Sequence, residues 1–258
     1  MGFAEFSLKI ESVPIIEGVV YENMSASISP VRTPFRLLPQ FKERVWGRTD
    51  LQGWFPVPSG KIIGEVWFTA SDNATSYGPS LGEVLSLHPE ILGDAFDPAN
   101  PALCPLLIKF LFTSAPLSVQ VHPDDTYALR HHQSLGKTEA WYILNSSPGA
   151  SITLGFREAI SQAQLQEAAL SGAIERLLSS KPVHTGEFVF VPAGTVHAIG
   201  AGLTICEIQQ NSDITYRLYD YGRPRELHLE HAAQVSDLGP YTETTSPVEI
   251  NEWRRHLG

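Results

Sequence analysis

Short segments in which apolar and polar residues alternate run through most of the chain, and glycine, proline, asparagine or serine separate them. A period of two places successive side chains on opposite faces of a β-strand. We therefore expect strands within 61–70, 103–113, 117–123, 139–145, 150–156, 186–200, 203–210 and 213–221. Many short strands joined by tight turns predict a mainly β fold, an antiparallel β-sandwich of the jelly-roll type. A parallel α/β fold is the disfavoured alternative, because its strands need helical crossovers.

Helical patterns are few, and two of them begin with a recognisable cap. Ser80 and Glu83 form a capping box ahead of an apolar run, which predicts that a helix starts there. Ser161 and Gln164 repeat this signal at the start of a helical insert, 160–178. We expect this insert and the other helices to pack at the periphery of the sheets.

The chain shows no internal repeat, low-complexity block or linker, so the sequence predicts a single domain over 1–258. Its first part is rich in proline and polar residues and contains two weaker candidate strands, 6–13 and 20–28. The expected parts are N-terminal strands in 1–60, a core over 61–232 that carries the insert, and a tail over 233–258.

One predicted strand carries polar side chains on a face that should be buried. In 118–125, Ser-Val-Gln-Val-His-Pro-Asp-Asp, Val119 and Val121 share one face while Gln120 and His122 share the other. A buried polar face is costly unless hydrogen bonds or a metal ion satisfy it. The alternative is an ordinary strand that is half exposed to solvent.

Other polar residues can join this face. Glu139 starts a later strand and shares its face with Lys137, and His197 begins a new strand after a Pro-Ala-Gly turn. With His122 and the Gln120 amide, these residues suit zinc or another borderline divalent cation. Three strong ligands and one weak or open position are typical of a catalytic metal site.

Histidine spacing alone does not fix this ligand set. The chain contains nine histidines, so accidental spacings are common. His131, His132 and His184 therefore stay open as rival ligands.

The charge balance excludes some classes of partner. The net charge is −10 and lysine and arginine form no long run, which argues against nucleic acid and anionic membranes as partners. A small anion needs only a few cations in a cleft. We see neither a signal-peptide pattern at the N-terminus nor an apolar stretch long enough to span a bilayer. Cys104 and Cys206 lie in apolar contexts typical of free thiols, so we expect a cytoplasmic protein.

Four motifs together resemble type I mannose-6-phosphate isomerase (phosphomannose isomerase), a zinc-dependent jelly-roll enzyme of the cupin class. They are 118–128, 136–144, 191–200 and 207–223, and the weaker matches are 42–51, 63–68 and 105–111. The resemblance runs in the same order from about residue 35 to 232. It implies one zinc ion per chain, and its implied ligands are Gln120, His122, Glu139 and His197.

The resemblance also implies the reaction, which is the interconversion of D-mannose 6-phosphate and D-fructose 6-phosphate through an enediol. It implies catalytic roles for Arg217, Lys137 and His122, with His122 assisting opening of the sugar ring. It further implies that Lys109, Lys137 and Asp213 bind the substrate, a small-molecule sugar phosphate. Cations suit a phosphate dianion and a developing oxyanion, although a surface salt bridge is the alternative for each.

Arg217 has two competing interpretations. Alternation places it on one face with Thr215 and Tyr219, so we expect its guanidinium across the cavity from the metal. The alternative is a surface ion pair with Asp213 or Asp220, which is typically worth less than about 1 kcal/mol.

The chain departs from the family in its last part. It ends about 40 residues after Arg217, where family members carry a further β-domain, so the far wall of the pocket is open to question. Two alternatives to the isomerase are a cupin that binds a metal and a sugar without turnover, and an isomerase of relaxed aldose specificity. The presence of Arg217, Lys137 and Lys109 beside the ligands favours the isomerase. We expect a monomer or a small homo-oligomer.

Overall fold

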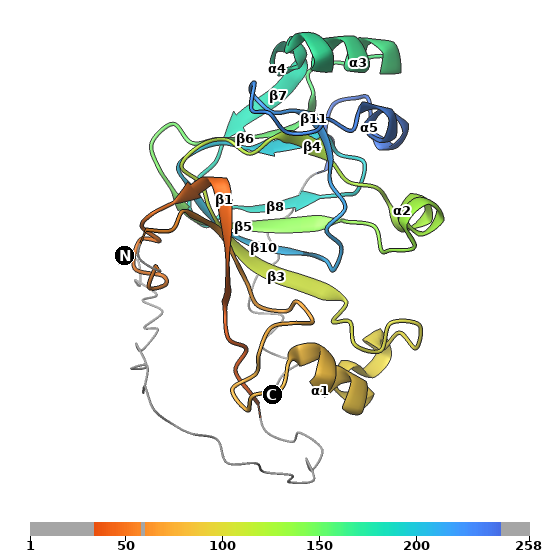
Figure 1. The fold of residues 1–258 in the computed structure, drawn as a ribbon. Coiled ribbons are helices and arrows are strands. Elements are labelled where there is room, and N and C mark those ends of the chain that lie inside the picture. Colours follow the sequence, from red (N-terminus) through yellow and green to blue (C-terminus); the bar gives the residue numbers. More distant parts are fainter. Residues whose placement is uncertain (1–33, 58–59, 244–258) are drawn as a thin grey trace, which may run out of the picture. The chain divides into compact units, whose positions relative to one another are not determined.

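The computed structural model describes residues 34–57 and 60–243, which form two antiparallel sheets with helices at their periphery (Figure 1). The strands are β1 (Gln40–Arg48), β2 (Ile63–Trp67), β3 (Leu106–Phe112), β4 (Val119–Val121), β5 (Glu139–Ser146), β6 (Ser151–Phe156), β7 (Leu178–Pro182), β8 (Phe188–Val191), β9 (His197–Ile199), β10 (Leu203–Gln210) and β11 (Tyr216–Tyr219). The helices are α1 (Leu81–Leu87), the 3₁₀ helix η1 (Pro89–Ala95), α2 (Asp125–His132), α3 (Gln162–Ser171), α4 (Ile174–Leu177) and α5 (Leu229–Val235). The predicted strands 6–13 and 20–28 lie outside the described residues.

The two sheets have the strand orders β1-β2-β3-β10-β5-β8 and β11-β4-β9-β6-β7. Each ladder between neighbouring strands of these sheets is antiparallel. Strands distant in sequence lie side by side; β10 pairs with both β3 and β5. This arrangement confirms the predicted mainly β, cupin-type jelly roll, and the parallel alternative is wrong.

Apolar side chains from both sheets share one core. Leu111 and Ile205 come from the six-stranded sheet and meet Ile152 and Ile199 from the five-stranded sheet, and all four are buried. Burial of such side chains stabilises the fold by roughly 1.5–3 kcal/mol each. The apolar core between the two sheets therefore stabilises the sandwich, and polar groups on the inner faces need hydrogen bonds or ion pairs.

A second core lies between the outer face of the five-stranded sheet and the helices that cover it. Val119 and Val121 of β4 pack there in one cluster with Leu165 of α3, Ile174 of α4 and Ala232 of α5. The alternation predicted for β4 is confirmed, because these two valines face the helices. The side chain between them, on the opposite face, is turned into the sandwich.

The predicted helix caps form as expected. Both bonds of the capping box are present at Ser80 with Glu83 before α1, and again at Ser161 with Gln164 before α3. The insert forms α3 and α4, which lie outside the sheets (Figure 1). Helices α2 and α5 were not predicted, because they have only eight and seven residues and lack a strong apolar period.

Two smaller expectations also have an outcome. Cys104 and Cys206 are partly buried free thiols, as predicted. Among the helices of the described residues, none has the length and apolar character needed to cross a bilayer.

Candidate active site

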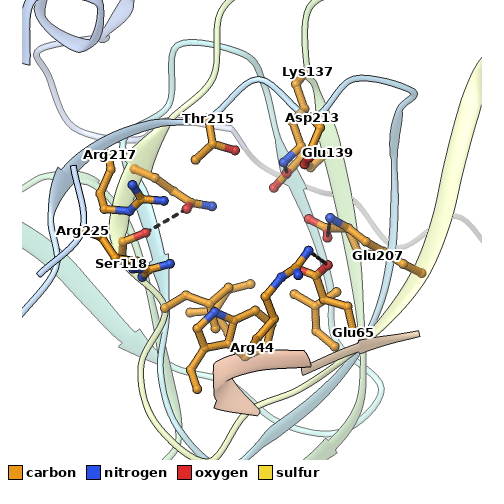
Figure 2. A pocket seen from close by; sticks show the side chains of 16 residues that line it. Arg44, Glu65, Ser118, Lys137, Glu139, Glu207, Asp213, Thr215, Arg217 and Arg225 are labelled. Atoms are coloured by element: carbon orange, nitrogen blue, oxygen red, sulfur yellow. Dashed lines mark hydrogen bonds and ion pairs between the residues drawn. The ribbon is translucent and has the colours of Figure 1, made fainter. Parts of the chain in front are cut away.

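A polar cavity of about 410 Å³ opens on the inner face of β4 (Figure 2). Gln120 of β4 pairs in register with Arg217 of β11 on one side and with His197 of β9 on the other. The sheet thus brings together residues that lie far apart in the sequence. The cavity is lined by Arg44, Trp46, Glu65, Lys109, Leu111, Leu117, Ser118, Gln120, Lys137, Glu139, Ile199, Glu207, Asp213, Thr215, Arg217 and Arg225.

Three predicted metal ligands converge behind this cavity. His122, Glu139 and His197 each offer a ligand atom, and these atoms lie within 4.8 Å of one another. His122 Nε2 is 3.2 Å from Glu139 Oε1, and His197 Nε2 is 3.7 Å from Glu139 Oε2. Within the described residues, this is the single group of three or more His, Cys, Asp or Glu with such spacing.

Both imidazoles are held so that Nε2 faces the group. His122 Nδ1 donates to the Ile214 carbonyl oxygen at 2.8 Å, and His197 Nδ1 donates to the Thr195 carbonyl oxygen at 2.9 Å. A backbone acceptor at Nδ1 fixes the tautomer that leaves the Nε2 lone pair free for a metal. The two histidines are therefore oriented as ligands by their surroundings.

The ionisation states also suit a cation. Burial, followed by the Lys137 ammonium, lowers the pKa of His122 to about 3. Burial likewise lowers the pKa of His197. Burial alone would raise the pKa of Glu139, but Lys137 and His122 hold it well below its usual range. The group thus offers two neutral imidazoles and one carboxylate at neutral pH.

Two observations show that a metal fits these residues. Glu139 Oε1 is buried and accepts no hydrogen bond, although Lys137 Nζ lies 2.9 Å away. A buried carboxylate oxygen without a hydrogen bond is costly, and an ion offsets that cost. The Gln120 amide lies at the same place, with Nε2 3.3 Å from His197 Nε2 and Oε1 accepting from Ser118 at 3.1 Å. If the amide group is rotated by 180°, its oxygen faces the histidines and can serve as a fourth metal ligand.

The rival histidines lie elsewhere. His131 and His132 belong to α2, where His131 stacks on Tyr127 and His132 bonds the Tyr216 hydroxyl. His184 lies in the turn before β8, and its backbone N–H is bonded by Glu187. The structure brings none of the three into the His122 group.

Lys137 and Lys109 are both buried, which removes the surface salt bridge as an interpretation of either. Lys137 Nζ lies 2.9 Å from Glu139 Oε1 and 3.3 Å from His122 Nε2. Lys109 Nζ lies 2.9 Å from Glu207 Oε2. Burial lowers the pKa of Lys109, but Glu207 and Glu65 raise it above its ordinary value. Lys109 therefore carries a buried positive charge in the cavity wall.

Glu207 is a cavity residue that our sequence interpretation missed. It pairs in register with Lys109, and the Trp141 indole N–H lies 3.1 Å from both Glu207 Oε1 and Glu139 Oε2. Burial, followed by the Glu139 carboxylate, raises the pKa of Glu207 to about 7. A signal was present, because Glu207 shares the inward face of its strand with the apolar Ile205.

Arg217 is turned into the cavity rather than paired at the surface. Its Nη1 donates to the Glu226 carbonyl oxygen at 2.8 Å, and its Nε is buried without a partner. Asp220 is bonded instead by the guanidinium groups of Arg223 and Arg225. Among the described residues neither Asp213 nor Asp220 forms an ion pair with Arg217, so that alternative is wrong.

The remaining predicted residues of this wall have mixed outcomes. Thr215 lines the cavity together with Asp213, whose side chain is exposed. Tyr219 does not share their face, because the register shifts between Arg217 and Tyr219 and the tyrosine packs against the helix-side core. The prediction for Tyr219 is wrong because a bulge breaks the alternation.

Comparisons with known proteins agree with this geometry. The family model described as "Phosphomannose isomerase type I, catalytic domain" matches residues 34–149. A mannose-6-phosphate isomerase of Streptococcus mutans is 40% identical over 222 residues, which are 80% of this chain and 68% of that protein. A probable mannose-6-phosphate isomerase of Bacillus subtilis, GmuF, is 39% identical over 85% of this chain and 73% of its own. The crystal structure of a Bacillus subtilis mannose 6-phosphate isomerase superposes with a TM-score of 0.75 at 35% identity, covering 85% of this chain and 74% of that one.

Proposed function

The chain belongs to the type I phosphomannose isomerase family, a family of aldose–ketose isomerases, and from this premise we propose the chemistry of its site. The proposal is that D-mannose 6-phosphate and D-fructose 6-phosphate interconvert through an enediol, with one zinc ion bound to each chain. The convergence of His122, Glu139 and His197 beside a cavity lined with cations carries this proposal.

The residues proposed to hold the zinc are His122, Glu139 and His197, with Gln120 as the weak fourth ligand. Neutral imidazoles and a carboxylate are donors that zinc prefers, and an incomplete set of strong ligands leaves room for a substrate oxygen. When bound, zinc would supply a Lewis acid that polarises a substrate oxygen. We assign His122 to the ligand role alone, since its Nδ1 is committed to Ile214 and its low pKa keeps the ring neutral.

We propose that Glu207 carries the proton between the two carbons. The ionised carboxylate takes the proton from C2 of the open-chain aldose, and the electron pair moves to O1 as the C1–C2 double bond forms. After O1 gains a proton and O2 loses one, Glu207 returns its proton to C1, which yields the ketose. A carboxyl group with a pKa near 7 can both accept and release a proton at neutral pH.

We propose that positive charge around the cavity stabilises the enediolate intermediate and binds the substrate phosphate. Lys109 and Lys137 stand beside the two buried carboxylates, and we propose that they contact substrate oxygens near C1 and C2. Arg217 and Arg225 lie on the opposite wall with Ser118 (Figure 2). We propose that the Arg217 guanidinium, which lines the cavity, donates to the enediolate and that Arg225 adds charge for the phosphate dianion.

The partners and location follow from the substrate. A sugar phosphate is a metabolite of the cell interior, so we propose a cytoplasmic enzyme. The net charge of −10 gives no support to nucleic acid or anionic membranes as partners. Asp213, exposed at the edge of the cavity, is proposed to bind a sugar hydroxyl.

Isomerisation in deuterated water tests the proton transfer. The proton held by Glu207 can exchange with solvent before it reaches C1, so the enediol route predicts some deuterium at C1 of fructose 6-phosphate, whereas a hydride shift from C2 to C1 would carry none. Proton NMR of the product distinguishes the two. Glu207→Gln should lower both turnover and deuterium exchange by roughly 10²–10⁴-fold, the usual contribution of a general base. Turnover or exchange unchanged in Glu207→Gln contradicts the proposal.

A further inference from the structure

Arg217 is held at its backbone by a histidine that lies outside the cavity lining. The Arg217 N–H donates to His228 Nδ1 at 3.1 Å, and the His228 N–H donates to the Arg217 carbonyl oxygen at 2.8 Å. A backbone N–H can only donate, so Nδ1 must be the acceptor. The imidazole is therefore neutral and carries its proton on Nε2.

These two hydrogen bonds satisfy the backbone N–H and C=O of Arg217, which a neighbouring strand would satisfy in the middle of a sheet. Strand β11 is an edge strand of the five-stranded sheet. Because the N–H and C=O of Arg217 both point toward His228, they point away from Gln120 on β4. Arg217 and Gln120 thus form a pair without mutual hydrogen bonds, in which side chains lie closest and Cα atoms are about 4.5 Å apart.

The same segment also holds the guanidinium. The Glu226 carbonyl oxygen accepts from Arg217 Nη1 at 2.8 Å, two residues before His228. The segment 226–228 therefore contacts Arg217 at its backbone N–H, its carbonyl and its side chain. The guanidinium Nε is buried at the cavity wall without a hydrogen-bond partner.

The charges around His228 favour the neutral ring. Burial, followed by the Arg217 guanidinium, lowers the pKa of His228, while Glu226 opposes this shift. His231 on α5 also disfavours a second positive charge, and the Tyr216 ring on β11 lies 6.3 Å away. A protonated Nδ1 would donate rather than accept, so it would lose the bond from Arg217.

We propose that His228 is a positioning residue for the isomerase reaction: its neutral Nδ1 fixes the backbone of Arg217 and so aims the guanidinium at the substrate. This inference rests on the proposed role of Arg217. It adds that His228, which lies outside the cavity lining, determines how precisely the Arg217 guanidinium is positioned. Protonation of His228 at acid pH weakens this positioning.

Variants that keep or remove the acceptor test the inference in the zinc-loaded enzyme. His228→Ala removes the acceptor and should lower kcat roughly tenfold, the cost of one hydrogen bond, with little change in KM. His228→Asn offers an amide oxygen near the position of Nδ1 and should restore most of kcat. His231→Asn, on helix α5 directly after His228, is the matched control and should leave kcat near that of the wild type.

A double-mutant cycle and a pH series separate positioning from a general structural effect. In an Arg217→Lys background, His228→Ala should cost little more, because the group it positions is already gone. Asparagine does not titrate, so the ratio of kcat in His228→Asn to kcat in the wild type should rise as pH falls through the lowered pKa of His228, below about 6.5. Long-range ¹H–¹⁵N spectra at pH 7 should show the Nε2–H tautomer, which reports on His228 independently of activity.

The possible failures are distinguishable. Wild-type turnover in Arg217→Lys overturns the proposed role of Arg217 and this inference with it. An impaired Arg217→Lys together with an unimpaired His228→Ala overturns the inference alone. The inference is also overturned if the losses of Arg217→Lys and His228→Ala add fully in the double variant. It is overturned as well if the kcat ratio of His228→Asn to the wild type does not change with pH, or if His228 carries its proton on Nδ1. If His228→Ala fails to fold, the pH ratio of His228→Asn and the tautomer decide.

Discussion

Arg217 stands directly opposite Gln120 across strands β11 and β4, so both side chains leave the sheet on the face that lines the cavity. The next strand, β9, places His197 opposite the other side of Gln120. A guanidinium, an amide and an imidazole thus form a row across three strands. The sheet register itself brings the proposed oxyanion donor next to the proposed metal.

Replacing Arg217 by Lys tests the donor role. Lysine keeps the positive charge but loses the planar fork of N–H donors, so kcat should fall by about 10²-fold, as for loss of an oxyanion donor. Zinc content and melting temperature should stay close to those of the wild type. Measured turnover equal to that of the wild type would remove Arg217 from the site.

Replacing His122 by Ala should remove metal and activity together. The variant loses one of three strong ligands, so its zinc affinity should fall by more than the roughly 10–100-fold that loss of an outer partner costs. Zinc per chain is measured by atomic absorption after dialysis. His131→Ala, in the exposed helix α2, is the control and should retain its metal. Full zinc in His122→Ala would show that the ligands are assigned wrongly.

Trp141 joins the metal ligand Glu139 to the proposed proton carrier Glu207, because its indole N–H lies 3.1 Å from an oxygen of each. Trp141→Phe keeps most of the buried volume but leaves both carboxylates without this donor. We expect zinc affinity to fall about 10–100-fold and the free energy of unfolding to fall by about 1–3 kcal/mol.

The matched control for this variant is Trp67→Phe. Trp67 donates in the same way to Glu65, at 2.7 Å, but contacts none of the proposed ligands. Its zinc affinity, measured by competition with a chromogenic chelator, should equal that of the wild type. Equal affinities in all three proteins would rule out a link between Trp141 and the metal.

Asp220 should make stability depend on pH in the acid range. Burial raises the pKa of Asp220, but hydrogen bonds from Arg225 and Arg223 bring it below its ordinary value. A carboxylate with a depressed pKa stabilises the folded state above its unfolded pKa of about 3.9, and this stability is lost as pH falls through the folded pKa. Asp220→Asn should therefore melt below the wild type at pH 7, and the gap should close toward pH 3. Calorimetry measures both, and a gap independent of pH contradicts this explanation.

Much of the fold follows from local pattern, and the exceptions have physical causes. Most strands and the two capping boxes were predictable because period-two alternation and cap chemistry are local, but β1 and β7 lie outside the predicted strand segments. Helices α2 and α5 escaped prediction because they are short and packing decides them. Tyr219 was misplaced because a bulge after Arg217 breaks the period, and bulges leave no simple trace in a sequence.

Part of the candidate site was likewise predictable from the sequence, and part was not. The polar face of β4 pointed to Gln120 and His122 from alternation alone, and the strands that follow supplied Glu139 and His197. Glu207 was missed although it shares the inward face of its strand with Ile205, which offered a signal. The contact between His228 and Arg217 was beyond sequence reasoning, since it depends on how the loop after β11 returns to the edge of the sheet.

The most direct test of the account is a coupled assay of fructose 6-phosphate formation, run on one preparation in three states. Zinc-loaded protein should convert mannose 6-phosphate to fructose 6-phosphate, chelated protein should lose that activity, and one equivalent of zinc per chain should restore it. The folded state of each sample is checked by circular dichroism. Folded protein that holds one zinc ion per chain yet forms no fructose 6-phosphate, or that keeps full turnover after the metal is removed, would contradict the account.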